Sequence, residues 1–264
     1  MDLIDSGTTE RTAHRVAGDS RAPARRFEHQ TGYVLHTYPY SESSLIVESF
    51  TRTHGRVPLL AKGAKRRGSA MRGVLRQFQP VELSWSGKGD LRNLTRAEWQ
   101  GGVPGLRDTA LFCGFYLNEL LLKLLARDDP HERLFDQYEI AVRALAEGPE
   151  RGGSAAHVLR RFEKELLGEI GYALNLGAEA DSSLPIDPTA RYTYDPERGP
   201  RPLSEHESCE IELSGRTLMA IRSGDYADPM AASQAKQLMR FLLRHHLNGK
   251  TLSTRTIFSA LQQL

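Results

Sequence analysis

The side chains of this chain that could do chemistry are mostly cations, and they gather in one short stretch. Lys and Arg recur from Arg52 to Arg76, while no Asp or Glu occurs between Glu48 and Glu82. The formal net charge of the whole chain is only +2, so this positive charge is a local feature. Long basic side chains can follow a phosphate backbone, so the stretch predicts a polyanion as its partner.

Glycines punctuate the same stretch. Gly63, Gly68 and Gly73 separate short basic groups, a composition that favours a mobile connection over a rigid element. The ordinary alternative is a solvated surface loop whose charges serve solubility. The basic run alone leaves both interpretations open, and the surrounding elements must decide between them.

Other candidates for catalysis or metal binding fail on spacing. The triplet at 249–251 resembles the end of a phosphate-binding loop, but Arg244 stands where the first glycine should be. The adjacent histidines at 245–246 would point in different directions on a helix, and no further ligand stands at metal-binding spacing. Cys113 and Cys209 are isolated, which predicts neither a disulfide nor a zinc site. We therefore expect no enzyme activity, no metal and no cofactor.

Length and composition predict a folded protein away from membranes. With 264 residues and 39% hydrophobic content, the chain can form one large or two modest domains. Its apolar stretch at 120–125 is short and contains Lys123, so it cannot span a bilayer. The residues before Phe27 have mixed charge and no apolar centre of the kind that an export signal needs. We expect a cytoplasmic protein whose residues 1–28 form a flexible tail.

Short runs separated by turn residues predict β-structure in the first part of the chain. Together they predict a small five-stranded barrel. Pro58 and Pro80 are awkward for central strands, so those runs are expected to begin, end or bulge at the prolines. The predicted strands are 33–36, 44–50, 56–60, 78–85 and 93–99.

After Gly105 the hydrophobic pattern changes to that of helices, so the predicted fold class is α+β. Asp108 and Asp228 are predicted N-caps, and Gly249 is predicted to stop the helix that Asp228 opens. A proline-rich and charged insertion at 177–210 is expected to be a loop with a short hairpin. The predicted helices are 108–126, 130–148, 154–170 and 228–246, followed by a short one at the C-terminus.

The third predicted helix carries a second basic group, formed by Arg160, Arg161 and Lys164. Its ordinary interpretation is a solvated face with ion pairs to neighbours such as Glu165. Binding of an acidic partner is the other interpretation.

Several motifs along the chain resemble those of a known family, the bacterial recombination mediator RecO. The resemblance covers nearly the whole chain after residue 30. The motifs that carry it are 34–45, 55–57, 61–64 and 75–80 in the first part, and 116–121, 159–163, 167–172 and 249–255 in the second.

The resemblance implies an oligonucleotide-binding (OB) fold barrel at 29–104, followed by a mainly α-helical domain at 105–264. It also implies a non-catalytic role in DNA repair and homologous recombination at the bacterial nucleoid. Proteins of this family bind single- and double-stranded DNA and anneal complementary strands. With RecR they help to load RecA onto DNA coated by single-stranded DNA-binding protein, whose acidic C-terminal tail they bind.

In such a barrel the basic run joins two strands and projects from the sheet, where a DNA backbone could lie across it. Aromatic side chains there could stack on bases, although an aromatic residue in a small barrel is more often part of the core. The predicted DNA-binding residues are Arg56, Lys62, Lys65, Arg66, Arg67, Arg72 and Arg76. The candidates for stacking are Tyr38, Tyr40, Phe50 and Trp85. The residues predicted to bind the acidic tail are Arg160, Arg161 and Lys164, with Lys250 and Arg255 as a second candidate for DNA or partner contact.

Some members of the family carry paired cysteines in the insertion, but here it contains Cys209 alone, so no structural zinc is expected. Two rival classes of function remain open. The first is a protein-interaction adaptor whose basic loop binds an acidic protein. The second is a hydrolase whose site is assembled from distant residues.

Overall fold

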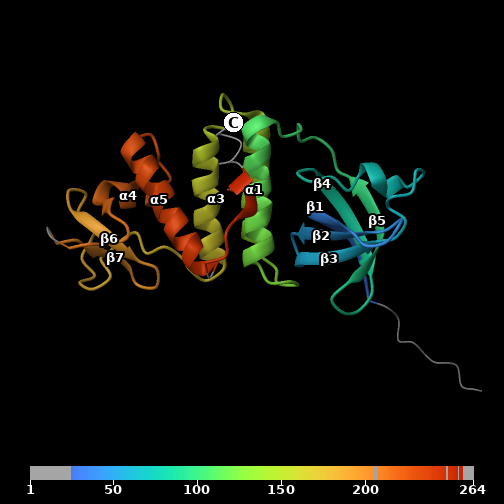
Figure 1. Ribbon diagram of the computed structural model, residues 1–264, viewed down its shortest axis with the longest axis horizontal. Helices are drawn as coiled ribbons and strands as arrows, with labels where there is room; N and C mark the ends of the chain where they lie inside the picture. The colour runs from blue at the N-terminus through green and yellow to red at the C-terminus, as the bar shows by residue number, and fades with distance from the viewer. Residues whose placement is uncertain (1–24, 205–206, 248, 255, 258–264) are drawn as a thin grey trace, which may run out of the picture.

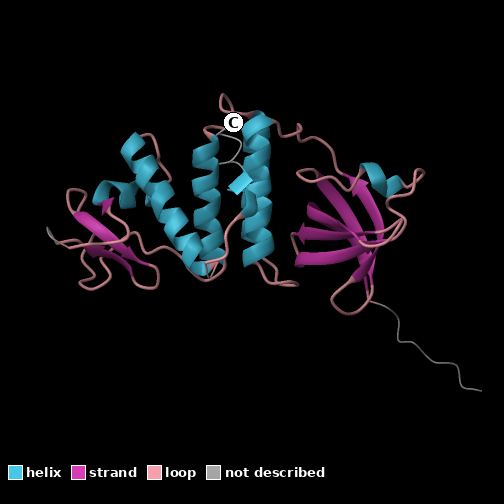
Figure 2. Ribbon diagram, in the orientation of Figure 1, coloured by secondary structure: helices cyan, strands magenta, loops and turns pink. Residues whose placement is uncertain are grey.

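The computed structural model describes residues 25–204, 207–247, 249–254 and 256–257. The molecule is elongated, with a β-barrel at one end, helices in the middle and a small sheet at the other end (Figure 1). This arrangement confirms the predicted fold class, a barrel followed by a mainly helical region (Figure 2).

Five strands close the barrel in the order β1-β2-β3-β5-β4, and each corresponds to a predicted strand. β1 begins earlier than predicted, because its first half pairs with β4 and its second half with β2. The polar residues of that first half conceal the strand in the sequence. The predicted tail at 1–28 is therefore wrong at its boundary, and residues 1–24 lie outside the described residues. The strands are β1 Arg26–Pro39, β2 Leu45–Thr51, β3 Gly55–Ala61, β4 Pro80–Ser86 and β5 Arg92–Trp99.

The two prolines behave differently in these strands. Pro80 is the first residue of β4, as expected. Pro58 instead lies within β3, where the pairing with β2 continues without a bulge. It is tolerated there because β3 pairs with β5 only at Leu59 and Leu60, so the other edge of β3 has no strand beside Pro58.

The helical region is built on α1, α2, α3 and α5, with α4 beside a small antiparallel sheet. β6 and β7 of this sheet form the hairpin expected in the insertion. Asp228 caps α5 as predicted, whereas Asp108 is the first residue of α1 and caps nothing. The helices are α1 Asp108–Leu124, α2 Glu132–Glu147, α3 Ala155–Glu169, α4 Gly215–Ser223 and α5 Pro229–His246. The strands are β6 Arg191–Asp195, β7 Gly199–Pro202 and β8 Leu213–Ser214.

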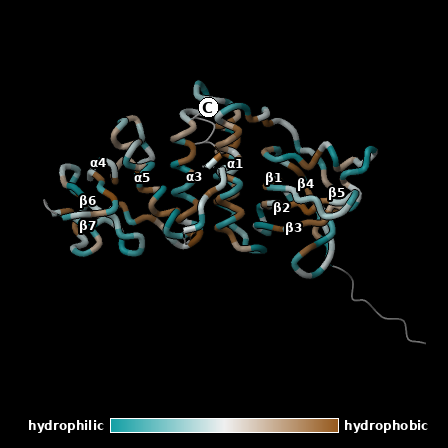
Figure 3. Tube along the Cα trace, viewed as in Figure 1, coloured by the Kyte–Doolittle hydropathy of each residue, from teal (hydrophilic) through white to brown (hydrophobic). Residues whose placement is uncertain are grey.

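The barrel and the helices share one hydrophobic core, and hydrophobic stretches appear brown along the strands and helices in Figure 3. Tyr33 and Phe50 of the barrel contact the rings of Phe135 and Tyr138 in α2, with centroids 5.1–6.1 Å apart. Buried Asn118 of α1 donates to a barrel carbonyl at 2.8 Å and accepts from Tyr138 at 2.6 Å. The outer face of β1 and β2 is thus partly covered by helices.

A single carboxylate fastens the C-terminal segment to α1. Glu119 accepts hydrogen bonds from the backbone N–H groups of Ser253 and Thr254 at 2.8 and 2.9 Å. Lys123, one turn further along α1, donates to the carbonyl of Thr251 at 2.7 Å. The segment 251–254 is therefore held by one side of α1.

Replacing Glu119 by Gln is expected to lower stability by about 1–2 kcal/mol at neutral pH, because charged hydrogen bonds are lost. Burial raises the pKa of Glu119, but hydrogen bonds from Thr254, Ser253 and Lys123 outweigh it and lower the pKa to about 2. The stabilisation is therefore present above the ordinary carboxyl pKa and is lost as pH falls toward the lowered value. Thermal midpoints of wild type and Glu119→Gln should converge progressively between about pH 5 and pH 2. The exposed Glu147→Gln change is the control. A difference in thermal midpoint between wild type and Glu119→Gln that does not change with pH would contradict the assignment.

Candidate nucleic-acid interface

The basic run forms a folded loop between β3 and β4, which we call the basic loop (residues 62–79). Successive turns shape it: Arg66 N–H donates to Gly63 at 3.1 Å, and Ser69 N–H donates to Arg66 at 3.1 Å. Ala64 is buried in the barrel core, and Lys65 N–H donates to Ser43 at 2.9 Å. The spaced glycines therefore belong to a loop folded into turns, and the prediction of a mobile connection is not supported.

Six cations of the basic loop are exposed. No ion pair joins any of them to a carboxylate in the part of the chain that the structure describes. Because these turns hold them close together, their positive charges add into one local field. The six are Lys62, Lys65, Arg66, Arg67, Arg72 and Arg76.

Arg56, the seventh predicted DNA-binding residue, does not belong to this surface. Its side chain is only 14% exposed and lies 3.6 Å from the carboxylate of Glu48. Its guanidinium also donates to the carbonyl of Leu122 in α1. Arg56 therefore ties β3 to the helical region, and we correct its predicted role for this reason.

Two other barrel cations are likewise neutralised. Arg52 lies 2.7 Å from Asp136, Arg92 lies 2.5 Å from Asp128, and both carboxylates come from the helical region. These two arginines therefore differ from the six exposed cations of the basic loop.

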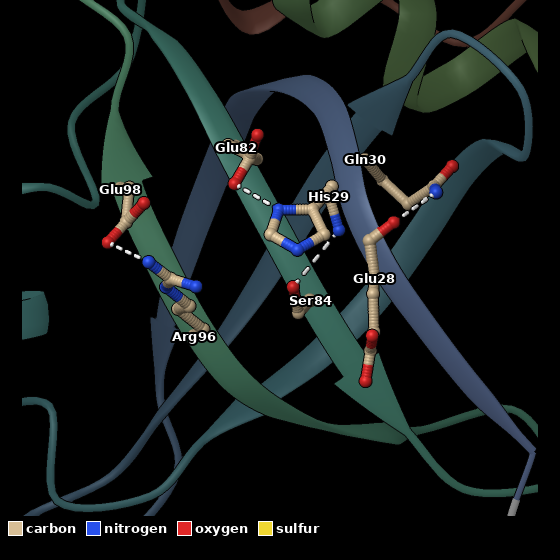
Figure 4. Close-up of polar contacts among 7 residues, drawn as sticks. All are labelled: Glu28, His29, Gln30, Glu82, Ser84, Arg96 and Glu98. Atoms are coloured by element: carbon tan, nitrogen blue, oxygen red, sulfur yellow. Dashed lines mark hydrogen bonds and ion pairs between the residues drawn. The ribbon is translucent and has the colours of Figure 1, made fainter.

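The outer face of β1, β4 and β5 has the opposite character (Figure 4). Glu82 accepts from His29 at 2.7 Å, and Arg96 donates to Glu98 at 2.6 Å. His29 has a positive φ of 54° in a bulge of β1, where its N–H donates to Ser84 at 3.2 Å. This face therefore carries paired charges of both signs, unlike the basic loop.

Two of the four candidate aromatics are exposed and two are not. Tyr38 and Tyr40 are 45% and 57% exposed, and the Lys65 ammonium donates to the carbonyl of the adjacent Ser41 at 2.9 Å. These tyrosines therefore lie beside the basic loop. Phe50 and Trp85 are fully buried in the core, so they cannot stack on bases.

Sequence reasoning missed a third exposed aromatic, Trp99. It is the last residue of β5 and is 60% exposed. The polar residues Glu98 and Gln100 that flank it were the available signal. Trp99 lines a cavity together with Arg76 of the basic loop.

The three residues predicted to bind an acidic tail do not share one surface. Arg160 is buried and lies 2.6 Å from buried Glu163, which also accepts from Tyr116 at 2.5 Å. Lys164 donates to the carbonyls of residues 221 and 222 at 3.1 and 2.9 Å and so holds α3 to α4. Arg161 alone is exposed. The predicted solvated face is wrong because α2 and α5 both pack on α3.

A groove between α1, α3 and α5 does contain Arg160. Its volume is about 260 Å³. Phe112, Tyr116 and Leu159 supply apolar wall, while Lys236 and Arg240 supply cationic groups near Arg160. Lys250 lies at an exposed turn, and Arg255 lies outside the described residues.

Over the residues that the structure describes, no group of three or more His, Cys, Asp or Glu side chains could hold a metal ion. Cys113 borders the groove, and burial raises the pKa of its thiol. In the same part of the chain, no helix is long and apolar enough to cross a membrane.

Two family models match the chain in succession. Residues 26–102 match the model described as Recombination protein O N terminal, and residues 109–255 match Recombination protein O C terminal. The chain belongs to the RecO family. The resemblance seen in the sequence motifs is therefore confirmed, and the RecO family is one of DNA repair and recombination proteins.

Individual RecO relatives cover the same region. The DNA repair protein RecO of Nitrosospira multiformis is 52% identical over 242 residues, which is 91% of this chain and 98% of the relative. The DNA repair proteins RecO of Aromatoleum aromaticum and Dechloromonas aromatica are 46% and 48% identical, over 91% and 90% of this chain and 98% of each relative.

Proposed function

We propose that this protein is a non-catalytic recombination mediator that binds single- and double-stranded DNA through the basic loop and anneals complementary strands. In this role it acts with RecR to help load RecA onto DNA coated by single-stranded DNA-binding protein. Membership of the RecO family supports the general role. The observation that carries the DNA contact is the set of six exposed cations on a loop fixed to the barrel.

The expected binding is electrostatic and independent of sequence. About five phosphate contacts would give a slope of log affinity against log salt of roughly −3.5 on single strands and −4.5 on duplex. Cations on the phosphates reduce repulsion between two strands and leave the pairing edges of the bases free. Such binding favours annealing and requires no bond to be broken.

The test is annealing of two complementary oligonucleotides, followed by fluorescence without nucleotide or metal, at low and moderate salt. We expect acceleration that weakens as salt rises. Absence of both acceleration and DNA binding would contradict the proposal and favour an adaptor that binds an acidic protein.

We also propose that the acidic tail of single-stranded DNA-binding protein binds in the groove between α1, α3 and α5. An acidic tail needs cationic groups beside apolar surface, and Phe112 and Leu159 line the groove that contains Arg160 and Lys236.

 In this proposal Arg160 contacts both Glu163 and the bound peptide. Arg161 and Lys164 are no longer among the residues expected to bind it.

Replacing Lys236 by Glu is expected to weaken binding of a labelled acidic-tail peptide roughly tenfold, because one attraction becomes a repulsion. Fluorescence anisotropy would measure the affinity. Arg161→Glu is the matched control, since it makes the same charge change on an exposed part of α3 outside the groove. Equal weakening by both changes would place the peptide elsewhere.

A further inference from the structure

The chain has two tryptophans, and their surroundings are opposite. Trp85 is 1% exposed in the barrel core, whereas Trp99 is 60% exposed at the end of β5. The Trp99 indole is nevertheless oriented, because its N–H donates to the side chain of Gln79 at 3.2 Å. Gln79 in turn donates to the carbonyl of Val103 at 2.9 Å. An exposed aromatic ring is thus held in position at the surface.

A cavity of about 570 Å³ opens beside this ring. Arg76 and Trp99 line it, and Val74, Phe78 and Leu106 add apolar surface. Its volume lies in the range of small-molecule sites. An aromatic plane, an apolar wall and a guanidinium are the groups that a nucleotide needs, since the base stacks on the ring and the phosphate pairs with the cation.

The inner wall of the cavity is tightly packed. Phe78 is 5% exposed, adopts a positive φ of 64°, and meets Phe115 of α1 edge-on at 5.3 Å. Gly114 of α1 permits this contact, because a Cβ there would lie 2.9 Å from the Phe78 ring and 2.5 Å from Leu106. The cavity is therefore part of the packed structure and has a defined wall against α1.

We propose that Trp99 and the cavity beside Arg76 form a binding site for one unpaired nucleobase of single-stranded nucleic acid. The inference rests on the proposed function, because Arg76 is the last cation of the basic loop and a backbone that follows the loop arrives at this cavity. A base in a duplex has both faces stacked and its edges paired, so an unpaired base alone can enter. The site therefore gives a preference for single strands over duplex. Phosphate contacts alone do not give this preference.

Intrinsic tryptophan fluorescence tests the site directly. Titration of the whole protein with oligothymidylate should quench Trp99, while Trp85 in the core supplies a constant background. Trp99→Phe should abolish the quenching but keep most of the affinity, because a phenyl ring still stacks. Trp99→Ala should weaken binding of oligothymidylate roughly 5- to 100-fold and change binding of a duplex less than about twofold.

Tyr172→Ala is the matched control, since Tyr172 is a 48% exposed aromatic of the helical region. Unchanged fluorescence together with wild-type affinity of Trp99→Ala would overturn this site while leaving the proposed DNA binding intact. Equal losses on single strands and duplex would also overturn it. Absence of any DNA binding by the wild-type protein would instead contradict the proposed function itself.

Discussion

Replacing Lys65, Arg66 and Arg67 together by Ala is expected to weaken binding of single-stranded DNA roughly 100-fold at low salt and to slow annealing in parallel. All three side chains are exposed and none forms an ion pair with a described carboxylate, so their loss removes phosphate contacts directly. Three lost contacts should also make the salt slope shallower by about 2. Affinity measured at several salt concentrations would reveal both effects.

A matched control separates the basic loop from net charge. Arg133, Arg151 and Arg216 are exposed on the helical region, and replacing them by Ala removes the same total charge. We expect this control to keep most of the affinity and nearly the whole salt slope. An unchanged annealing rate in the loop variant, or an equal loss of affinity in the two variants, would contradict the assignment of DNA binding to this loop.

Replacing Arg160 by Ala is expected to destabilise the fold by about 3–5 kcal/mol, because buried Glu163 would lose its cationic partner. For a chain of this size the thermal midpoint should fall by roughly 6–20 °C. The neighbouring exposed residue offers a control, since Arg161→Ala should change stability by less than about 0.5 kcal/mol. Thermal unfolding of the three proteins makes the comparison.

The cost of Arg160→Ala should depend on pH. Burial raises the pKa of Glu163, and Arg160 opposes that rise. Without Arg160 the carboxyl group binds its proton more tightly in the folded protein, so the penalty grows as pH rises through the raised pKa of Glu163 and shrinks as pH falls below it. A penalty that does not grow with rising pH would contradict this account. Charge reversal at Arg160 would therefore report on folding as well as on partner binding.

The sequence predicted the five strands and most helices because alternation and helical periodicity are local patterns. It could not distinguish Arg56 from Lys62, since both belong to one basic run. Arg56 points toward Leu122 of α1, and only the packing of the helices on the barrel makes that contact. Arg160 was misplaced for a similar reason, because a periodic apolar face on α3 does not reveal that α5 covers a second face.

Aromatic residues show the same limit. Trp85 and Trp99 both end predicted strands, yet one is in the core and the other is at the surface. The strand alternation of β5 is too weak to orient Trp99, whose neighbours Ala97 and Glu98 are both partly buried. Burial in a small barrel depends on closure through the β3–β5 and β1–β4 pairings, which single-strand patterns do not contain.

The hydrophobic core shared by the barrel and the helices has a mechanical consequence. Tyr33 and Phe50 pack against α2, so the barrel that carries the basic loop and the helices that form the groove are joined by one core. This shared core would keep a DNA strand on the loop and a peptide in the groove at one separation. On a strand coated by protein, this separation decides whether one copy of the chain can bind the DNA and the peptide at the same time.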